Sequence, residues 1–352
     1  MRGLVLEGVG RVSYRTDLPW PSISSPTDAI VVVHRAGLCG SDLHPYEGRE
    51  TVRFGVVPGH EAVGEVVAVG AAVRDFAPGD RVLVPFTTSC GACRACRAGL
   101  SSRCEQGSLF GYGPPDDADA PVLHGGQAEL LRVPLADGTL VRVPEGMTDE
   151  QALLLADNFP TGWYAVERAD VRSGEVVVVV GLGAVGLCAV AAAHAHGARA
   201  VLGVDPVEER RRRAAALRAA TATPDAAPTA LATMTEHAGA ASVIEAAGTL
   251  PAQELAFSLV RPGGTLSVIA VQTSERLAFT PAQAYDANLS VRFGRAPVRS
   301  LLERIMPRLG RGVELPTEAV VSHPRIPLEQ GPDAYRRFAA RESGLVKGLF
   351  QP

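Results

Sequence analysis

The chain has 352 residues, 46% of them apolar and 20% charged, which is the balance of a globular protein and excludes disorder as its main organisation. Its length favours two domains. The net charge of −4, from 34 basic and 38 acidic residues, gives no strong electrostatic attraction to nucleic acid or to an anionic membrane, so we expect neither as a partner. The first residues contain no apolar stretch long enough for a signal peptide, which favours a cytoplasmic protein.

Short β-branched runs separated by glycine and proline fill the first 155 residues or so, and they predict an all-β, barrel-like domain. The clearest of these runs are residues 29–33, 64–70 and 80–85. Near residue 150 the character changes, because Thr148 and Gln151 have the spacing of a helix capping box. Residues 344–350 predict a strand at the end of the chain.

From about residue 170 to 295, strand and helix patterns alternate, which predicts a parallel, doubly wound sheet. The predicted strands are 175–180, 199–204, 241–246 and 264–270, the first two helices are 184–196 and 207–220, and 221–228 is a predicted loop. Residues 176–193 carry no charge and have the length of a membrane span. They open with five valines and contain three glycines, which favours a buried strand, a turn and a helix instead.

The sequence Gly181-x-Gly183-x-x-Gly186 follows a predicted strand and opens a predicted helix, which is the context of a dinucleotide-binding loop. Asp205 ends the next strand, where a carboxylate accepts hydrogen bonds from ribose hydroxyls and repels a 2′-phosphate. We therefore expect NAD rather than NADP. Two alternatives stay open: a glycine turn without a ligand, and an arginine of the run 210–213 that reaches a 2′-phosphate.

Four cysteines with the spacing C-x2-C-x2-C-x7-C predict a closed, structural zinc site. They are Cys90, Cys93, Cys96 and Cys104. An iron–sulfur cluster is a weaker alternative, since its spacings differ and the proline that follows its last cysteine is missing. Unliganded or disulfide-bonded cysteines are the remaining alternative.

A second set of metal-binding residue types is spread over the segments 37–44, 58–61 and 155–158, which together supply a thiolate, an imidazole and a carboxylate. A thiolate, an imidazole and a carboxylate leave the fourth position of a zinc ion open for water or substrate. Taken singly, each has a plain structural explanation, since a lone cysteine is usually a small buried apolar residue.

In order along the chain, the motifs Cys39-Gly-Ser-Asp-x-His44 and Gly59-His-Glu-x2-Gly64, the cysteine lobe and the glycine-rich loop resemble the zinc-dependent medium-chain alcohol dehydrogenase family. The segment 125–129 (GGQAE) resembles the branch that includes formaldehyde-dehydrogenase-like enzymes. The resemblance implies an α/β fold of two domains. A GroES-like β-barrel catalytic domain would take residues 1–158 and 296–352, and a Rossmann NAD-binding domain residues 159–295.

The resemblance also implies roles for individual residues. Cys39, His60 and Asp157 match the catalytic zinc ligands, Glu61 a carboxylate behind the metal that can swing in as a transient ligand, and Asp42 the residue that orients the histidine. The remaining matches are the proton relay Ser41 and His44, the substrate-pocket residue Phe86, and the cofactor-binding residues Gly181, Gly183, Ala184, Val185, Gly186, Asp205 and Thr161, together with Lys347, the only lysine, near the phosphates.

The activity implied is that of a zinc-dependent, NAD(H)-linked oxidoreductase that interconverts a small-molecule alcohol and an aldehyde or ketone, with two zinc ions per chain. The family further implies a homodimer or homotetramer. Three alternatives remain at this point: a zinc-independent quinone or enoyl reductase, a redox-neutral or biosynthetic enzyme that uses NAD transiently, and a non-catalytic NAD-binding protein.

Overall fold

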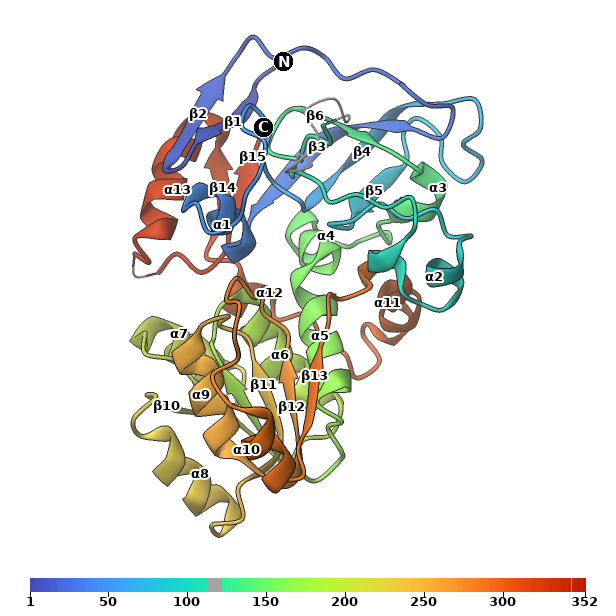
Figure 1. Cartoon of the computed structure of the whole chain (residues 1–352). Coiled ribbons are helices and arrows are strands. Elements are labelled where there is room, and N and C mark those ends of the chain that lie inside the picture. The colour runs from blue at the N-terminus through green and yellow to red at the C-terminus, as the bar shows by residue number, and fades with distance from the viewer. Residues whose placement is uncertain (113–121, 343) are drawn as a thin grey trace. The chain divides into compact units, whose positions relative to one another are not determined.

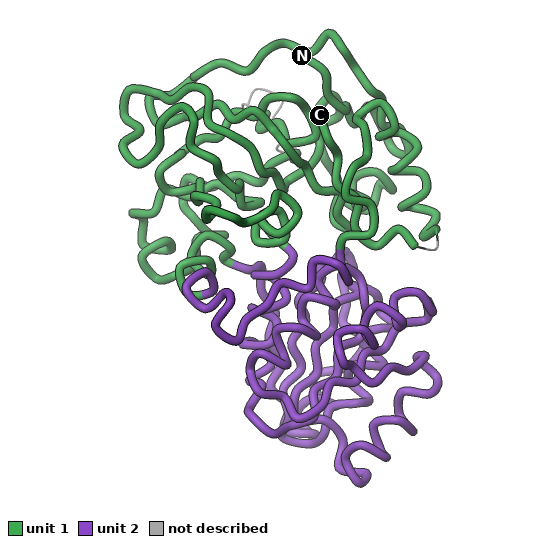
Figure 2. The backbone as a smooth tube through the Cα atoms, turned by 180° about the vertical axis from the view of Figure 1, so that it is seen from behind, with its two compact units in different colours: residues 1–157, 297–304, 321–352 green, residues 158–296, 305–320 purple. Residues whose placement is uncertain are grey.

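The computed structural model describes residues 1–112, 122–342 and 344–352, and divides this part of the chain into two compact units (Figures 1 and 2). Unit 1 comprises Met1–Asp157, Pro297–Arg304 and Val321–Pro352, and unit 2 comprises Asn158–Ala296 and Ile305–Val320. The expected boundaries differ mainly in residues 305–320, which belong to unit 2. The reason is local packing: the Arg213 guanidinium donates to the Ala319 carbonyl, and Arg308 lies 4.7 Å from the centre of the Trp163 ring.

Unit 1 is built on a seven-stranded, mainly antiparallel sheet, as far as its residues are described. Its strand order is β14-β15-β3-β4-β5-β7, and β6 pairs with the first residues of β3, on the edge opposite β4. A separate hairpin is formed by β1 (Gly3–Gly8) and β2 (Arg11–Arg15). The sheet strands are β3 (Ala29–Leu38), β4 (Ala62–Val69), β5 (Arg81–Val84), β6 (Leu130–Val133), β7 (Val141–Arg142), β14 (His323–Pro327) and β15 (Gly348–Gln351). The predicted β-rich first half is confirmed, and the last strand begins later than predicted.

Short helices connect these strands and carry several of the candidate residues. They are η1 (Gly40–Asp42), α1 (Leu43–Tyr46), α2 (Arg94–Arg97), η2 (Ser101–Arg103), α3 (Ala136–Thr139), α4 (Asp149–Ala156), η4 (Leu328–Gln330) and α13 (Gly331–Ala339), with α11 (Val298–Ile305) at the edge of the unit. The predicted capping box is present in α4, where Thr148 and Gln151 exchange hydrogen bonds. This cap starts the helix that leads to Asp157.

Unit 2, which is described throughout, is a six-stranded parallel sheet in the order β10-β9-β8-β11-β12-β13. Its strands are β8 (Val176–Val180), β9 (Ala200–Val204), β10 (Ala220–Ala222), β11 (Ala240–Glu245), β12 (Val260–Val268) and β13 (Ser290–Phe293). Its helices are α5 (Asn158–Arg168), α6 (Ala184–Ala195), α7 (Glu208–Ala216), α8 (Ala227–Thr235), α9 (Leu250–Leu259), α10 (Pro281–Asp286), η3 (Met306–Arg308) and α12 (Thr317–Val320). The strand order reverses between β8 and β11, and ligands of such sheets bind outside the carboxyl ends of the strands at this point.

Two predictions in this unit were right only in part. The helix expected at 207–220 ends at Ala216, and the loop expected at 221–228 is limited to residues 223–226, between an edge strand and the start of α8. Ala220–Ala222 extends the sheet by pairing with β9, a long-range contact that an Ala/Thr-rich sequence does not announce. Pro228 lies in the first turn of α8, where the backbone N–H groups make no hydrogen bonds within the helix, so the N–H that proline lacks is not needed. Of the helices described, none has the length and apolar character needed to cross a membrane.

Candidate functional site

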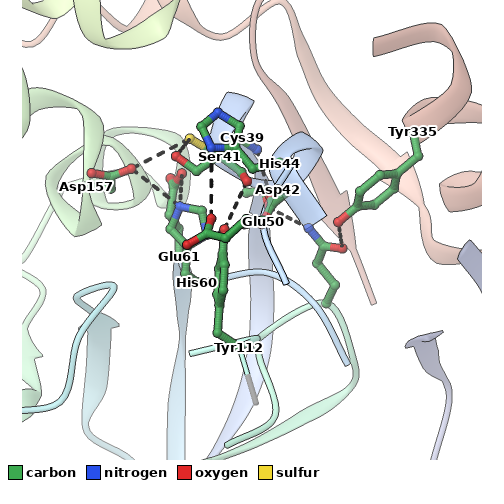
Figure 3. A network of polar contacts seen from close by, with 12 residues as sticks. Cys39, Ser41, Asp42, His44, Glu50, His60, Glu61, Tyr112, Asp157 and Tyr335 are labelled. Atoms are coloured by element: carbon green, nitrogen blue, oxygen red, sulfur yellow. Dashed lines mark hydrogen bonds and ion pairs between the residues drawn. The ribbon is translucent and has the colours of Figure 1, made fainter. Parts of the chain in front are cut away.

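Cys39, His60, Glu61 and Asp157 form one buried cluster in unit 1, with one ligand atom from each lying within 4.8 Å of the others (Figure 3). Cys39 follows the end of β3, and the His60–Glu61 pair directly precedes β4. These two ends meet because β3 and β4 are antiparallel, with Ala36 opposite Ala62. Asp157 is placed by the end of α4.

The separations within the cluster suit a shared ion. Asp157 Oδ2 lies 3.8 Å from Cys39 Sγ and 3.6 Å from His60 Nε2. Ligands of a tetrahedral zinc, at bond lengths of 2.0–2.3 Å, lie about 3.2–3.8 Å apart. Asp42 orients two of the ligands, since its carboxylate contacts His60 Nδ1 at 3.1 Å and accepts the Cys39 N–H at 2.9 Å. The other imidazole nitrogen, Nε2, therefore faces the cluster.

The cluster is also electrostatically suited to a cation. Burial lowers the pKa of His60, but the carboxylates of Asp42 and Asp157 outweigh burial and raise it well above the usual range for histidine. Glu61 Oε2 is buried and has no hydrogen-bond partner among the described residues. Cys39 supplies a sulfur, His60 a nitrogen and Asp157 a carboxylate oxygen, and the unpartnered Glu61 oxygen lies in the same cluster. Three such donors fit a zinc ion that keeps one position open.

Glu61 is held from the opposite side by Lys347. The Lys347 ammonium lies 2.5 Å from Glu61 Oε1, and both side chains are fully buried. The Ser322 hydroxyl fixes the backbone at this point, because it donates to the Lys347 carbonyl and accepts the Lys347 N–H. The ammonium is thus paired with Glu61 inside unit 1. The contact between Lys347 and the cofactor phosphates, which the resemblance implies, stays a prediction.

The four lobe cysteines also converge on one point, with their sulfur atoms within 4.8 Å of one another and all four thiols free. Cys93 precedes α2, and backbone N–H groups point at the sulfur atoms of this turn: Cys93 N–H at Cys90 Sγ, and Cys96 N–H at Cys93 Sγ. Donation from the N–H groups of Cys96 and Glu105 lowers the pKa of Cys93 to about 6. Burial, in contrast, raises the pKa of Cys96 to about 12 and also raises that of Cys104. The hydrogen bonds thus favour a thiolate at Cys93, and the convergence of four sulfur atoms fits a closed zinc site.

The relay and pocket candidates lie around the same cluster. Ser41 Oγ is 3.8 Å from Cys39 Sγ, and the Phe86 ring meets the His60 ring edge to face at 6.3 Å between centroids. His44 Nδ1 lies 3.9 Å from a Glu50 carboxylate oxygen. Burial, together with the charge of Arg49, lowers the pKa of His44 to about 4, so its imidazole is neutral at pH 7.

Two residues of this region were missed by sequence reasoning. Tyr112 is largely buried and donates its hydroxyl proton to the Ser41 carbonyl at 2.9 Å, and burial raises its pKa. Glu50, beside His44, lies beyond the motif that ends at His44. Both lie outside recognisable motifs and outside any periodic element, so no local signal marks them.

In unit 2 the glycine-rich loop has the geometry that its sequence predicts. Gly181 has φ +93°, a conformation that glycine favours. A Cβ on Gly186 would lie 1.9 Å from the Gly181 carbonyl oxygen, so a glycine is needed there. A Cβ on Gly183 would meet nothing within 4 Å, which leaves space beside the N-terminus of α6. Ala184 and Val185 open this helix, and such an end attracts phosphate.

Asp205 lies at the carboxyl end of β9, as predicted, and its carboxylate fastens the loop. Oδ2 accepts the Leu182 N–H and Oδ1 accepts the Val207 N–H, each at 2.8 Å. Arg211 donates instead to the carbonyls of Asp205 and Pro206, while Arg210 lies 3.6 Å from the carboxylate. Thr161 is buried in α5 of the same unit.

Comparison with known proteins agrees with this architecture. Residues 25–145 match the family "Alcohol dehydrogenase GroES-like domain", and residues 184–301 match "Zinc-binding dehydrogenase". A probable zinc-binding alcohol dehydrogenase of Mycobacterium tuberculosis is 40% identical over 353 aligned positions, which span 100% of this chain and 89% of that protein. Zinc-type alcohol dehydrogenase B of Aspergillus flavus is 37% identical and covers 97% of this chain and 79% of its own length.

The structure is similar to that of an alcohol dehydrogenase from Thermus sp. ATN1, with a TM-score of 0.90, 36% identity, and coverage of 100% of this chain and 99% of that one. The GroES-like domain and the Rossmann-type domain expected from the sequence are thereby confirmed. The chain belongs to the zinc-dependent medium-chain alcohol dehydrogenase family, a family of oxidoreductases.

Proposed function

We propose that the protein is a zinc- and NAD-linked dehydrogenase that interconverts a small alcohol and its aldehyde or ketone. The observation that carries the proposal is the buried set Cys39, His60 and Asp157, with the unpartnered Glu61 Oε2 beside it. A zinc-independent quinone or enoyl reductase has no use for such a set. A non-catalytic NAD-binding protein would not need it either.

When bound, zinc supplies a Lewis acid for the substrate oxygen and NAD supplies the acceptor for the hydride. The alcohol loses a hydride from carbon and a proton from oxygen, and the chain must carry the proton away. In this proposal Ser41 accepts it, and the 3.8 Å distance from Ser41 Oγ to Cys39 Sγ supports the assignment. His44 lies one turn further along the segment η1–α1 and is neutral at pH 7, so it can take the proton on to solvent.

The remaining side chains support and shape the site. Asp42 holds His60 in the orientation that presents Nε2, and Phe86 gives the pocket an apolar wall beside this imidazole. The four-cysteine lobe would hold a second zinc with a structural role. Asp205 supports a preference for NAD over NADP, because a buried carboxylate repels a 2′-phosphate. The proposal includes a homodimer or homotetramer, by family analogy alone.

Zinc content per chain tests the proposal directly. We expect two zinc ions in the purified protein, one in an Asp157→Ala variant and one in a Cys93→Ser variant, with dehydrogenase activity lost in the Asp157→Ala variant. A panel of primary and secondary alcohols with NAD then defines the substrate. A single zinc that Asp157→Ala leaves in place would mean that the Cys39 cluster is no metal site, and the proposal would fall.

A further inference from the structure

The segment 125–129 has no role in the proposed chemistry, yet its glutamine is fully buried near the metal cluster. Gln127 lies between the glycine pair Gly125–Gly126 and β6, and none of its surface is exposed. A buried amide needs hydrogen-bond partners for its N–H groups and its oxygen, since a buried donor or acceptor without a partner costs about 1–3 kcal/mol. The partners of Gln127 therefore indicate what the side chain does.

Gln127 contacts the segment that supplies Cys39. Its Nε2 donates to the Gly37 carbonyl at 2.9 Å, two residues before the cysteine. Gly37 itself links the ligand-bearing segments, because its N–H donates to the Glu61 carbonyl at 3.0 Å. A Cβ on Gly37 would lie 2.8 Å from Glu61 Oε2 and 3.0 Å from Lys347 Nζ. The hydrogen bond from Gln127 thus ends at a glycine that packs directly against Glu61 and Lys347.

Gln127 also packs against the segment that supplies His60. A Cβ on Gly59 would lie 2.5 Å from Gln127 Cγ, and Gly59 has φ +91°, so the residue before the histidine must be a glycine. Two backbone bonds hold the segments together, from Gly126 N–H to Gly59 O and from Gln127 N–H to Pro58 O. One side chain therefore touches two of the three chain segments that carry the candidate metal ligands, those of Cys39 and His60.

The amide is fixed in turn by α13. Tyr335 is buried and donates its hydroxyl proton to Gln127 Oε1 at 2.9 Å (Figure 3). The Tyr335 ring stacks on Phe350 in β15, with 12° between the ring planes, and lies near Tyr46 at 5.4 Å between centroids. These contacts tie the amide to the C-terminal part of unit 1 and leave it one orientation.

We propose that Gln127 is a positioning residue of the metal site, which holds the Cys39 and His60 segments at the separation that one ion requires before the ion binds. The inference rests on the proposed catalytic metal site. Groups that support metal ligands typically contribute 10–100-fold to metal affinity, because a preorganised site does not spend binding energy on ordering its ligands.

The test compares two variants. Gln127→Met keeps the length of the side chain and removes both hydrogen bonds. Gln127→Glu keeps an oxygen that accepts from Tyr335 but puts a second oxygen in place of the N–H group that donates to Gly37. Tyr335→Phe is the matched control, because it removes one hydrogen bond of the same network without touching the ligand segments. Each protein is loaded with Co²⁺, whose visible spectrum reports the geometry of a thiolate-containing site, and the metal is titrated out with a chelator. The four-cysteine site of the same molecule serves as internal reference.

We expect Gln127→Met and Gln127→Glu to weaken metal binding at the Cys39 cluster by about 10–100-fold and to alter its Co²⁺ spectrum. The reference site should keep its affinity, and Tyr335→Phe should have the smaller effect. Unchanged affinity and spectrum in Gln127→Met, or equal weakening at both sites, would overturn the positioning role. If Gln127→Met does not fold, Gln127→Glu decides by the same criteria. A wild-type protein that binds metal only at the four-cysteine site would refute the proposed function instead, so the two failures are distinguishable.

Discussion

The Lys347–Glu61 pair gives the most quantitative prediction that the structure supports. Both side chains are fully buried and their charged atoms lie 2.5 Å apart. Replacing Lys347 with Met removes the counter-charge and either leaves Glu61 buried as an ion without that partner or forces it to bind a proton. Removing one partner of a buried ion pair typically costs about 3–5 kcal/mol.

The size of the destabilisation in Lys347→Met follows from the cost of protonating Glu61. Glu61 has an ordinary pKa of 4.5 in an unfolded chain, and burial raises its pKa in the folded protein. Protonating such a carboxyl at pH 7 costs about 3.4 kcal/mol, at about 1.36 kcal/mol for each pH unit above 4.5. The Lys347 ammonium counteracts this effect of burial, so Lys347→Met raises the folded pKa of Glu61 further above the unfolded value. The added destabilisation is therefore present above pH 4.5 and disappears as the pH falls toward it. Between pH 7 and pH 5.5 the penalty should shrink by about 2 kcal/mol.

Urea unfolding of wild type and Lys347→Met at both pH values measures this difference. Lys347→Arg should keep most of the stability, and the double variant Glu61→Gln/Lys347→Met should recover part of it, since no uncompensated charge remains. A penalty below about 1 kcal/mol at pH 7, or one that does not change with pH, would refute the reasoning.

Burial of the pair is checked separately by chemistry. Lys347 is the only lysine of the chain, so an amine-acetylating reagent should modify the folded protein only at its N-terminal amine. The unfolded protein should carry a second label at Lys347, which mass spectrometry detects. Rapid labelling of Lys347 in the folded protein would contradict its burial.

The other predictions concern the cofactor loop and the relay histidine. Asp205→Ala should lower the ratio of kcat/KM with NAD to that with NADP by about 10–100-fold, the worth of hydrogen bonds to a charged acceptor; an unchanged ratio would contradict the assigned specificity. His44, whose pKa falls from 6.5 to about 4 on folding, makes the wild type lose stability as the pH drops through that window, because the unfolded chain takes up the proton first. His44→Gln should lose less stability between pH 7 and pH 4.5 in urea unfolding, and an equal loss in both proteins would show that His44 titrates normally.

Features encoded by neighbouring residues could be predicted from the sequence. The glycine-rich loop needs Gly181 and Gly186 for reasons internal to a strand–turn–helix unit, and the backbone angles and close approaches confirm them. The four-cysteine lobe forms within fifteen residues, so its spacing already carries its geometry. The alternation of strands and helices identified the parallel sheet, because periodicity is a local property.

Where an outcome depended on contacts between distant segments, local patterns failed. The strand β10 forms because it pairs with the edge of β9. Residues 305–320 belong to unit 2 because they contact α5 and α7 of that unit. Cys39, His60 and Asp157 were proposed as ligands from a family resemblance, whereas their meeting in space depends on the pairing of β3 with β4 and on the end of α4.

The surroundings of the metal cluster depend on tertiary structure most of all. Lys347 meets Glu61 across 286 residues, and Tyr335 meets Gln127 across 208. No periodicity or spacing marks these pairs, since each contact joins segments far apart in the chain that the packing of unit 1 brings together, including the pairing of β15 with β3. The sequence by itself determined which chemical groups the site has available. The tertiary structure determined which charge faces which, because a buried charge or amide must take its partner from whatever the packed chain brings beside it.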